Sequence, residues 1–187
     1  MRARLPELDA LVVADYQTVG VITPAVTEAL NQLAMEFSKT LFVVDSRERV
    51  GSFKHMVVKP NDIEAGRFFF PGRDSASIQI EDLSRAGMDW QKANQRPVYI
   101  TLGSRGCLVC DQGTTRQVPA MKVPPPVDTV GAGDTFLASL TAGLVGGATP
   151  VEAACLATLA TGVTIRKLGV TGTASPQEIL AQYDGML

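Results

Sequence analysis

The sequence predicts an α/β fold with a mostly parallel central sheet, and two kinds of pattern support this. Continuous apolar runs at residues 10–14 (ALVVA) and 40–44 (TLFVV) are typical of buried parallel strands. Between them, Thr23 and Pro24 begin a helix, with an N-cap hydroxyl followed by proline at the first helical position. A strand, helix, strand order implies a right-handed crossover between parallel strands. At 187 residues, 45% of them hydrophobic, the chain is long enough for a real core.

The same signals place the remaining elements. Strands are predicted at residues 55–58, 97–102, 107–110 and 116–121, the last two forming a hairpin around a turn at 111–113. Helices are predicted to begin at Asn61, at or just after Gly133, at Pro150 and after Ser175. The segment 77–93 has the pattern of an amphipathic helix, with Ile80, Leu83 and Trp90 facing inward.

The stretch 128–136, DTVGAGDTF, is the strongest candidate for a catalytic site. Gly131 and Gly133 allow backbone angles that side chains forbid and leave the approach to the helix start open. A helix N-terminus binds anions through its free amides and its dipole. Asp134 falls in the first turn, where it is placed to accept a proton from a bound hydroxyl. As a pattern alone, a Gly-rich loop with a first-turn carboxylate that favours the dipole explains these residues equally well.

DTVGAGDTF closely resembles the C-terminal signature of the PfkB or ribokinase family of carbohydrate kinases. The resemblance implies that Asp134 is the catalytic base and that the amides of Gly131, Ala132 and Gly133 form an anion hole. It also implies a three-layer ribokinase-like fold, incomplete at the N-terminus. Residues 1–187 would then be the C-terminal nucleotide-binding and catalytic part of that domain.

Two further motifs match the nucleotide site of this family. Asn61 and Glu64 form a capping box by their spacing, and they also match the NxxE motif that arranges water around magnesium and the ATP phosphates. ITLGSRG resembles the family's ATP loop, although a bare GxxG is typical of any tight turn. The resemblance gives these residues as nucleotide contacts: Thr101, Gly103, Ser104, Arg105, Gly106 and Thr158.

The resemblance also implies a site for a monovalent cation, most simply potassium. Its ligands would be the Asp128 carboxylate, the Thr173 hydroxyl, and the backbone carbonyls of Val130, Thr164, Lys167 and Gly169. A helix C-cap is an alternative explanation for Gly169.

Other polar residues have ordinary structural explanations. Asp45 and Arg47 follow a strand and lie where open α/β folds bind ligands, but a solvated loop explains them more simply. Three cysteines do not make a disulfide framework. Cys107 and Cys110 have CxxC spacing within a predicted strand, where positions three apart face opposite sides, which argues against a redox or zinc site.

Charge and hydropathy exclude several classes of partner. A net charge of −2 gives no electrostatic reason to expect nucleic acid or an anionic membrane. No run of eighteen apolar residues is present, and MRARLPELDA lacks the apolar region of a secretory signal. We therefore expect a cytoplasmic protein.

The resemblance implies an ATP-dependent, magnesium-dependent kinase acting on a hydroxyl of a sugar or sugar phosphate. ADYQ, DSR and RKLGVTGTASPQEI look most like the heptose-7-phosphate kinase domain of bacterial ADP-heptose synthesis. The stretch from ITLGSRG to DTF looks equally like ribokinase.

The family's sugar-binding half has no counterpart in this sequence. We therefore expect a homodimer or a missing N-terminal half as partner, and association or poor solubility of the chain alone. A truncated, catalytically silent nucleotide-binding remnant is the alternative function. A dinucleotide-dependent oxidoreductase is disfavoured, because no GxGxxG follows the first strand.

Overall fold

The computed structural model describes residues 1–185, which form two compact units. Unit 1 comprises Met1–Leu102 and Leu108–Arg116. Unit 2 comprises Gly103–Cys107 and the chain from Gln117 onward. Within residues 1–185, no helix has the length and apolar character needed to cross a membrane.

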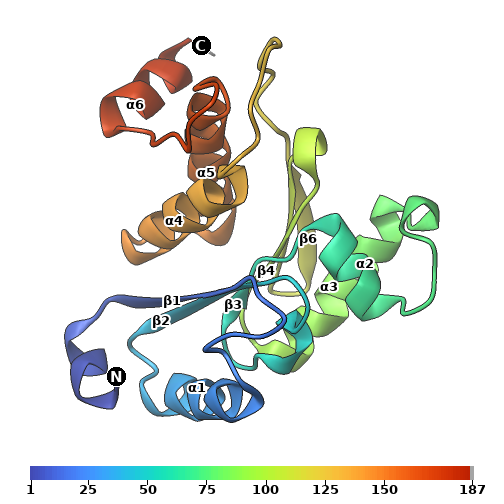
Figure 1. The fold of residues 1–187 in the computed structure, drawn as a ribbon, viewed down its shortest axis with the longest axis vertical. Coiled ribbons are helices and arrows are strands. Elements are labelled where there is room, and N and C mark those ends of the chain that lie inside the picture. Colours follow the sequence, from blue (N-terminus) through green and yellow to red (C-terminus); the bar gives the residue numbers. More distant parts are fainter. Residues whose placement is uncertain (186–187) are drawn as a thin grey trace. The chain divides into compact units, whose positions relative to one another are not determined.

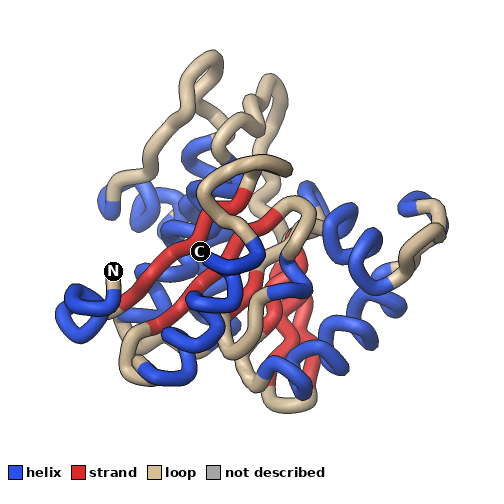
Figure 2. Tube along the Cα trace, turned by 60° about the horizontal axis from the view of Figure 1, so that its bottom comes forward, coloured by secondary structure: helices blue, strands red, loops and turns tan. Residues whose placement is uncertain are grey.

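The strands form a six-stranded sheet that runs in sequence order. Figure 1 shows β1 and β2 side by side, and Figure 2 draws the strands in red. The first four strands pair in parallel, which confirms the predicted α/β class with a mostly parallel sheet. The six strands are β1 (Ala10–Asp15), β2 (Leu41–Ser46), β3 (Val57–Val58), β4 (Val98–Thr101), β5 (Cys107–Asp111) and β6 (Thr114–Val118).

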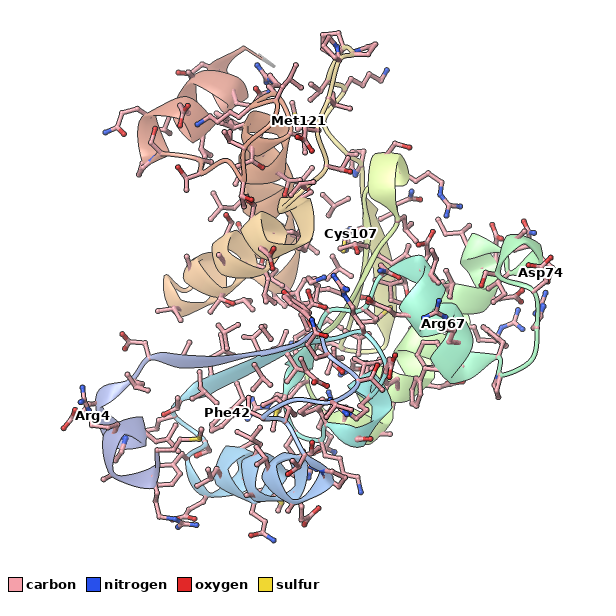
Figure 3. The ribbon with its side chains drawn as sticks, in the orientation of Figure 1. Arg4, Phe42, Arg67, Asp74, Cys107 and Met121 are labelled. Atoms are coloured by element: carbon pink, nitrogen blue, oxygen red, sulfur yellow. The ribbon has the colours of Figure 1, made fainter. Side chains whose placement is uncertain are left out.

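One face of this sheet packs against three helices of unit 1. They are α1 (Pro24–Glu36), α2 (Asp62–Phe69) and α3 (Ile80–Asn94). Leu30 and Leu83 from the helices share one buried cluster with Phe42, Val58 and Ile100 from the strands; Figure 3 labels Phe42. Alternate strand residues point to the same face, so the core takes every second residue of each strand.

The capping signals in the sequence predicted where helices begin more accurately than the apolar runs predicted the bounds and burial of the strands. Thr23 caps α1 as predicted, its hydroxyl accepting from the Val26 amide at 3.3 Å. Helix α3 begins three residues after the predicted start, because Ser75–Ser77 forms a separate 3₁₀ turn, η3. That turn is capped by Asp74.

Two strand predictions are wrong in part. Strand β1 is not buried throughout: Val13 is 5% exposed but Val12 is 46% exposed. Val13 points into the buried cluster that includes Leu30 of α1, whereas Val12 points to the opposite face, where β1, at the edge of the described sheet, has only β2 beside it. Strand β3 is limited to Val57–Val58, because His55 has φ of 62°, which lies outside the extended region.

The predicted hairpin is present, with shifted ends. Gln112 (φ 45°) and Gly113 (φ 74°) form its two-residue turn, and positive φ at both positions is typical of a type I′ turn. Strand β6 ends at Val118 rather than at residue 121. Pro119 follows, and it has no amide hydrogen to donate to a neighbouring strand.

Unit 2 contains three helices: α4 (Ala132–Val145), α5 (Pro150–Thr164) and α6 (Pro176–Asp184). Helices α4 and α5 approach closely at Gly143, where an added Cβ would lie 3.2 Å from the Cα of Ala153. The predicted capping boxes at Thr149 and Ser175 are both present. Helix α4 begins at Ala132, one residue before the predicted start.

Candidate active site

The start of α4 has the geometry that its glycines require. Gly131 is the N-cap, with φ of 76°, a left-handed conformation that other residues rarely adopt. A Cβ at this position would also lie 2.6 Å from Cγ2 of Thr171, so a side chain is excluded twice. The Ala132 amide donates to the Thr129 carbonyl at 3.1 Å and thereby closes the preceding turn. Of the three amides predicted to bind an anion, that of Ala132 therefore has an internal partner.

Gly133 and Asp134 are exposed in the first turn of α4. Apart from the adjacent residues and the nearby backbone of α4 itself, no heavy atom of the described residues lies within 4 Å of a Cβ built on Gly133. First-turn amides have no carbonyl within the helix to accept from them. The arrangement thus combines an open approach, a positive helix end and a carboxylate, which suits an anion bound beside a hydroxyl.

Asp128 connects this loop to the segment after α5. Its Oδ1 accepts from the Val130 amide at 3.0 Å, and its Oδ2 accepts from the Gly169 amide at 2.9 Å. These two hydrogen bonds lower the pKa of Asp128, the Val130 amide having the larger effect. Gly169 has φ of 70°, but α5 ends at Thr164, so Gly169 is not the C-cap of that helix. The structure therefore brings together two of the predicted cation ligands, 41 residues apart.

Val130, another predicted cation ligand, lies beside Asp128 in the loop before α4, whereas Thr164, Lys167 and Thr173 lie at the end of α5 and in the segment after it. The Thr164 carbonyl accepts from the Lys167 amide at 2.9 Å. The Lys167 ammonium contacts the Thr173 carbonyl and lies 2.7 Å from Oε1 of Glu178. All the predicted ligands are oxygens, which fit a hard monovalent cation, and their roles remain predictions.

The predicted ATP loop is a tight turn in unit 2. Gly103–Arg105 forms a 3₁₀ turn, η4, and the Gly106 amide donates to the Gly103 carbonyl at 3.0 Å. Gly106 has φ of 94°, and a Cβ there would lie 1.9 Å from the Val118 carbonyl oxygen. Ser104 and Arg105 are exposed on this turn, whereas Thr158 is buried within α5.

The NxxE motif of unit 1 is a complete capping box, as predicted. The Asn61 side chain accepts from the Glu64 amide, and Oε2 of Glu64 accepts from the Asn61 amide, each at 2.8 Å. Burial raises the pKa of Glu64, and the hydrogen bond from Asn61 opposes this shift. Asn61 also forms a β-bridge to Thr101, so the structure brings the NxxE motif and the first predicted residue of the ATP loop together.

The expectation of a solvated Asp45 is wrong. Asp45 and Lys59 are 5% and 3% exposed, and their charged groups lie 2.9 Å apart. Arg47 is exposed, as expected, with its guanidinium 5.2 Å from the centre of the Tyr16 ring. Lys59 was not singled out from the sequence, although a lysine directly after a buried Val-Val pair is a signal for a buried partner.

A second buried carboxylate was also missed. Asp15 ends β1 and accepts from Nε of Arg49 at 3.1 Å and from the Ser46 hydroxyl at 2.7 Å. Arg49 also donates to the carbonyls of Gln17 and Thr18. The hydrogen bond with Asp15 raises the pKa of Arg49. This network fixes the loops that leave β1 and β2.

Comparison with known proteins identifies the family whose pattern this chain matches. Residues 6–178 match the model of the pfkB family of carbohydrate kinases. The bifunctional protein HldE of Trichlorobacter lovleyi is 32% identical over 187 residues, which cover 97% of this chain and 36% of the relative. HldE of Caulobacter sp. is also 32% identical, over 98% of this chain and 37% of the relative. The chain thus spans little more than a third of these relatives.

Solved structures show the same fold. Phosphofructokinase-2 from Escherichia coli, determined in complex with potassium, has a TM-score of 0.74 and 25% identity, covering 99% of this chain and 60% of that one. Ribokinase from Thermotoga maritima has a TM-score of 0.73 and 21% identity, covering 98% of this chain and 59% of that one. The predicted ribokinase-like fold is thereby confirmed.

Proposed function

This chain belongs to the pfkB family of carbohydrate kinases, and we propose that it carries the catalytic part of a sugar kinase. The reaction would move the γ-phosphoryl group of ATP to a hydroxyl of a sugar or sugar phosphate. The observation that carries the proposal is the exposed Asp134 in the first turn of α4, directly after the open backbone at Gly133. We also propose a cytoplasmic location, as expected from the sequence.

In the proposed reaction, Asp134 accepts the proton of the acceptor hydroxyl. The hydroxyl oxygen forms a bond to the γ-phosphorus, and the bond to the β-phosphate oxygen breaks and releases ADP. The amides of Gly131 and Gly133 stabilise negative charge on the transferred group, together with the positive end of α4. Phosphoryl transfer depends mainly on such positioning and charge stabilisation.

Two cations belong to the proposal. Magnesium, when bound, neutralises the nucleotide phosphates, and Asn61 and Glu64 would hold the water around it. The cap uses Oδ1 of Asn61 and Oε2 of Glu64, so Nδ2 and Oε1 are the atoms proposed for this role. A monovalent cation would be held by the oxygens around Asp128 and Gly169. The structure of phosphofructokinase-2 from Escherichia coli was determined in complex with such a cation, potassium.

For the acceptor we propose a phosphorylated sugar. The proposal is supported by the HldE relatives and by the resemblance of RKLGVTGTASPQEI to heptose-7-phosphate kinases. The remaining nucleotide contacts would be Thr101, the loop Gly103–Gly106 and Thr158.

The test is an assay of ADP formation by the chain with ATP, magnesium, potassium and a panel of sugars and sugar phosphates. We expect Asp134→Asn to lower turnover by about 10²–10⁴-fold, because it removes the general base. ATP affinity, measured by calorimetry, should stay unchanged. Asp184→Asn, an exposed carboxylate at the end of α6, is the control and should behave as wild type.

Unchanged turnover in Asp134→Asn would remove Asp134 from the reaction. ATP binding without turnover on any acceptor would instead favour a catalytically silent nucleotide-binding remnant.

A further inference from the structure

Unit 1 contains a cavity of about 420 Å³ between the segment after β2 and helix α2. Figure 3 labels one of its residues, Arg67, on α2. The cavity is lined by Arg47, Glu48, Val50, Glu64, Arg67 and Phe68. All six residues belong to unit 1, so the cavity is complete within that unit.

The Phe68 ring, which forms an apolar wall of the cavity, is held in place by the residues that it contacts. The Phe68 ring lies against Gly51, where an added Cβ would come within 1.9 Å of the ring. On other sides the ring contacts Trp90, with centroids 4.9 Å apart, and Phe69, at 5.0 Å. Phe68 is nevertheless 41% exposed. The ring is therefore fixed, yet it is open to a ligand.

The two acidic residues of the cavity already have partners. Glu48 accepts from the Thr18 hydroxyl at 3.1 Å, and Glu64 accepts from the Asn61 amide. The buried Asp45 nearby is paired with Lys59. The hydrogen bonds and the ion pair of these carboxylates are thus made with groups other than the two arginines, although the charge of Arg47 also acts on Glu64 and lowers its pKa slightly against the effect of burial.

The two arginines are held less firmly. Arg47 stacks on Tyr16, and within residues 1–185 neither Arg47 nor Arg67 has a carboxylate oxygen within 4.0 Å of its guanidinium. Each guanidinium offers a planar set of donors that matches the oxygens of a phosphate. Two such groups in one cavity, beside a fixed aromatic ring, suit an anion attached to a carbon skeleton.

We propose that this cavity is a phosphate-binding subsite, in which Arg47 and Arg67 bind the phosphate and Phe68 contacts the group that carries it. The phosphate belongs either to a phosphorylated sugar acceptor or to the nucleotide. Only this choice of ligand rests on the proposed kinase function, because the binding of phosphate itself follows from the residues of the cavity.

The test uses inorganic phosphate and the fluorescence of Trp90, the only tryptophan in the sequence and a neighbour of Phe68. We expect saturable phosphate binding that Arg47→Gln and Arg67→Gln each weaken by about tenfold or more, as for loss of a charge-assisted hydrogen bond. Arg85→Gln, an exposed arginine on α3, should bind like wild type. Calorimetry with phosphate provides a second readout, and circular dichroism checks that each variant is folded.

Absence of phosphate binding by both methods, or equal binding in folded Arg47→Gln and Arg67→Gln, would overturn the proposal. Competition then identifies the ligand. Displacement of phosphate by glucose 6-phosphate but not by glucose assigns the subsite to the acceptor, and displacement by ATP alone assigns it to the nucleotide. If neither glucose 6-phosphate nor ATP displaces phosphate, the subsite does not serve the proposed kinase reaction.

Failure of the subsite and failure of the kinase proposal give different results. If the wild-type chain transfers no phosphoryl group but binds phosphate, and Arg67→Gln loses this binding, the subsite proposal stands and the kinase proposal fails. If wild type and Arg67→Gln phosphorylate sugar phosphates equally well, the kinase proposal stands and the subsite proposal fails.

Discussion

At the scale of single residues, the Asp45–Lys59 ion pair matters most for unit 1. The ammonium and carboxylate lie 2.9 Å apart, and both residues are buried. Asp45 also lies 3.4 Å from the hydroxyl of Tyr16, a weak hydrogen bond. A buried charge left without its partner is costly, whereas a buried neutral pair is tolerated. The pair therefore fixes the ends of β2 and β3 relative to each other.

We predict that Lys59→Met lowers the free energy of unfolding by about 3–5 kcal/mol, because it leaves the Asp45 carboxylate buried and unpaired. Asp45→Asn combined with Lys59→Met should recover part of this loss, since no buried charge remains. Chemical denaturation of the single and double variants measures both effects. Lys54→Met, an exposed lysine of the same unit, is the control. Additive losses in the double variant would contradict the pairing.

At the scale of elements, local signals predicted the helix starts because each cap lies within four residues of the chain. Thr23, Asn61, Thr149 and Ser175 all cap helices as predicted. Strand burial depends instead on neighbours that the local sequence does not contain. The run ALVVA therefore gave no indication that β1 is an edge strand with Val12 exposed.

The candidate site was predictable to the extent that it is local or resembles a known motif. The Gly131 conformation and the capping box at Asn61 follow from neighbouring residues. The contact between Asp128 and Gly169 joins residues far apart in sequence, and only the family resemblance indicated it. The Asp15–Arg49 network also joins distant residues, and no motif marked it.

The segment between α5 and α6 makes a prediction about pH. The Lys167 ammonium, together with the Ser175 amide, lowers the pKa of Glu178 from 4.5 to about 2. Because the pKa is lower in the folded protein, ionised Glu178 stabilises the fold above about pH 4.5, and this contribution is lost as pH falls towards 2. Glu178→Gln keeps an oxygen for the Ser175 amide but removes the charge.

We therefore expect Glu178→Gln to be less stable than wild type at pH 7, with the difference disappearing near pH 2. Thermal unfolding followed by circular dichroism across this range is the measurement. Asp184→Asn, an exposed carboxylate of the same helix, should track wild type at every pH. A difference between Glu178→Gln and wild type that does not change with pH would show that the ion pair does not contribute.

At the scale of the whole molecule, one edge of the described sheet is formed by β1. Strand β1 pairs with β2 alone, so the backbone amides and carbonyls along its other edge have no strand beside them in the described sheet. Val12 is exposed on the same strand. Unpaired edges with exposed apolar residues favour pairing with another chain.

We predict that the 187-residue chain associates as its concentration rises, and that Val12→Lys shifts it towards the monomer, because a lysine on an edge strand opposes strand addition. Sedimentation velocity over a concentration series measures the association. Val19→Lys is the matched control: Val19 is 90% exposed but lies in the loop after β1 rather than on the strand. An equal effect of both substitutions would assign the change to net charge, and a monomer at every concentration would show that the β1 edge does not pair.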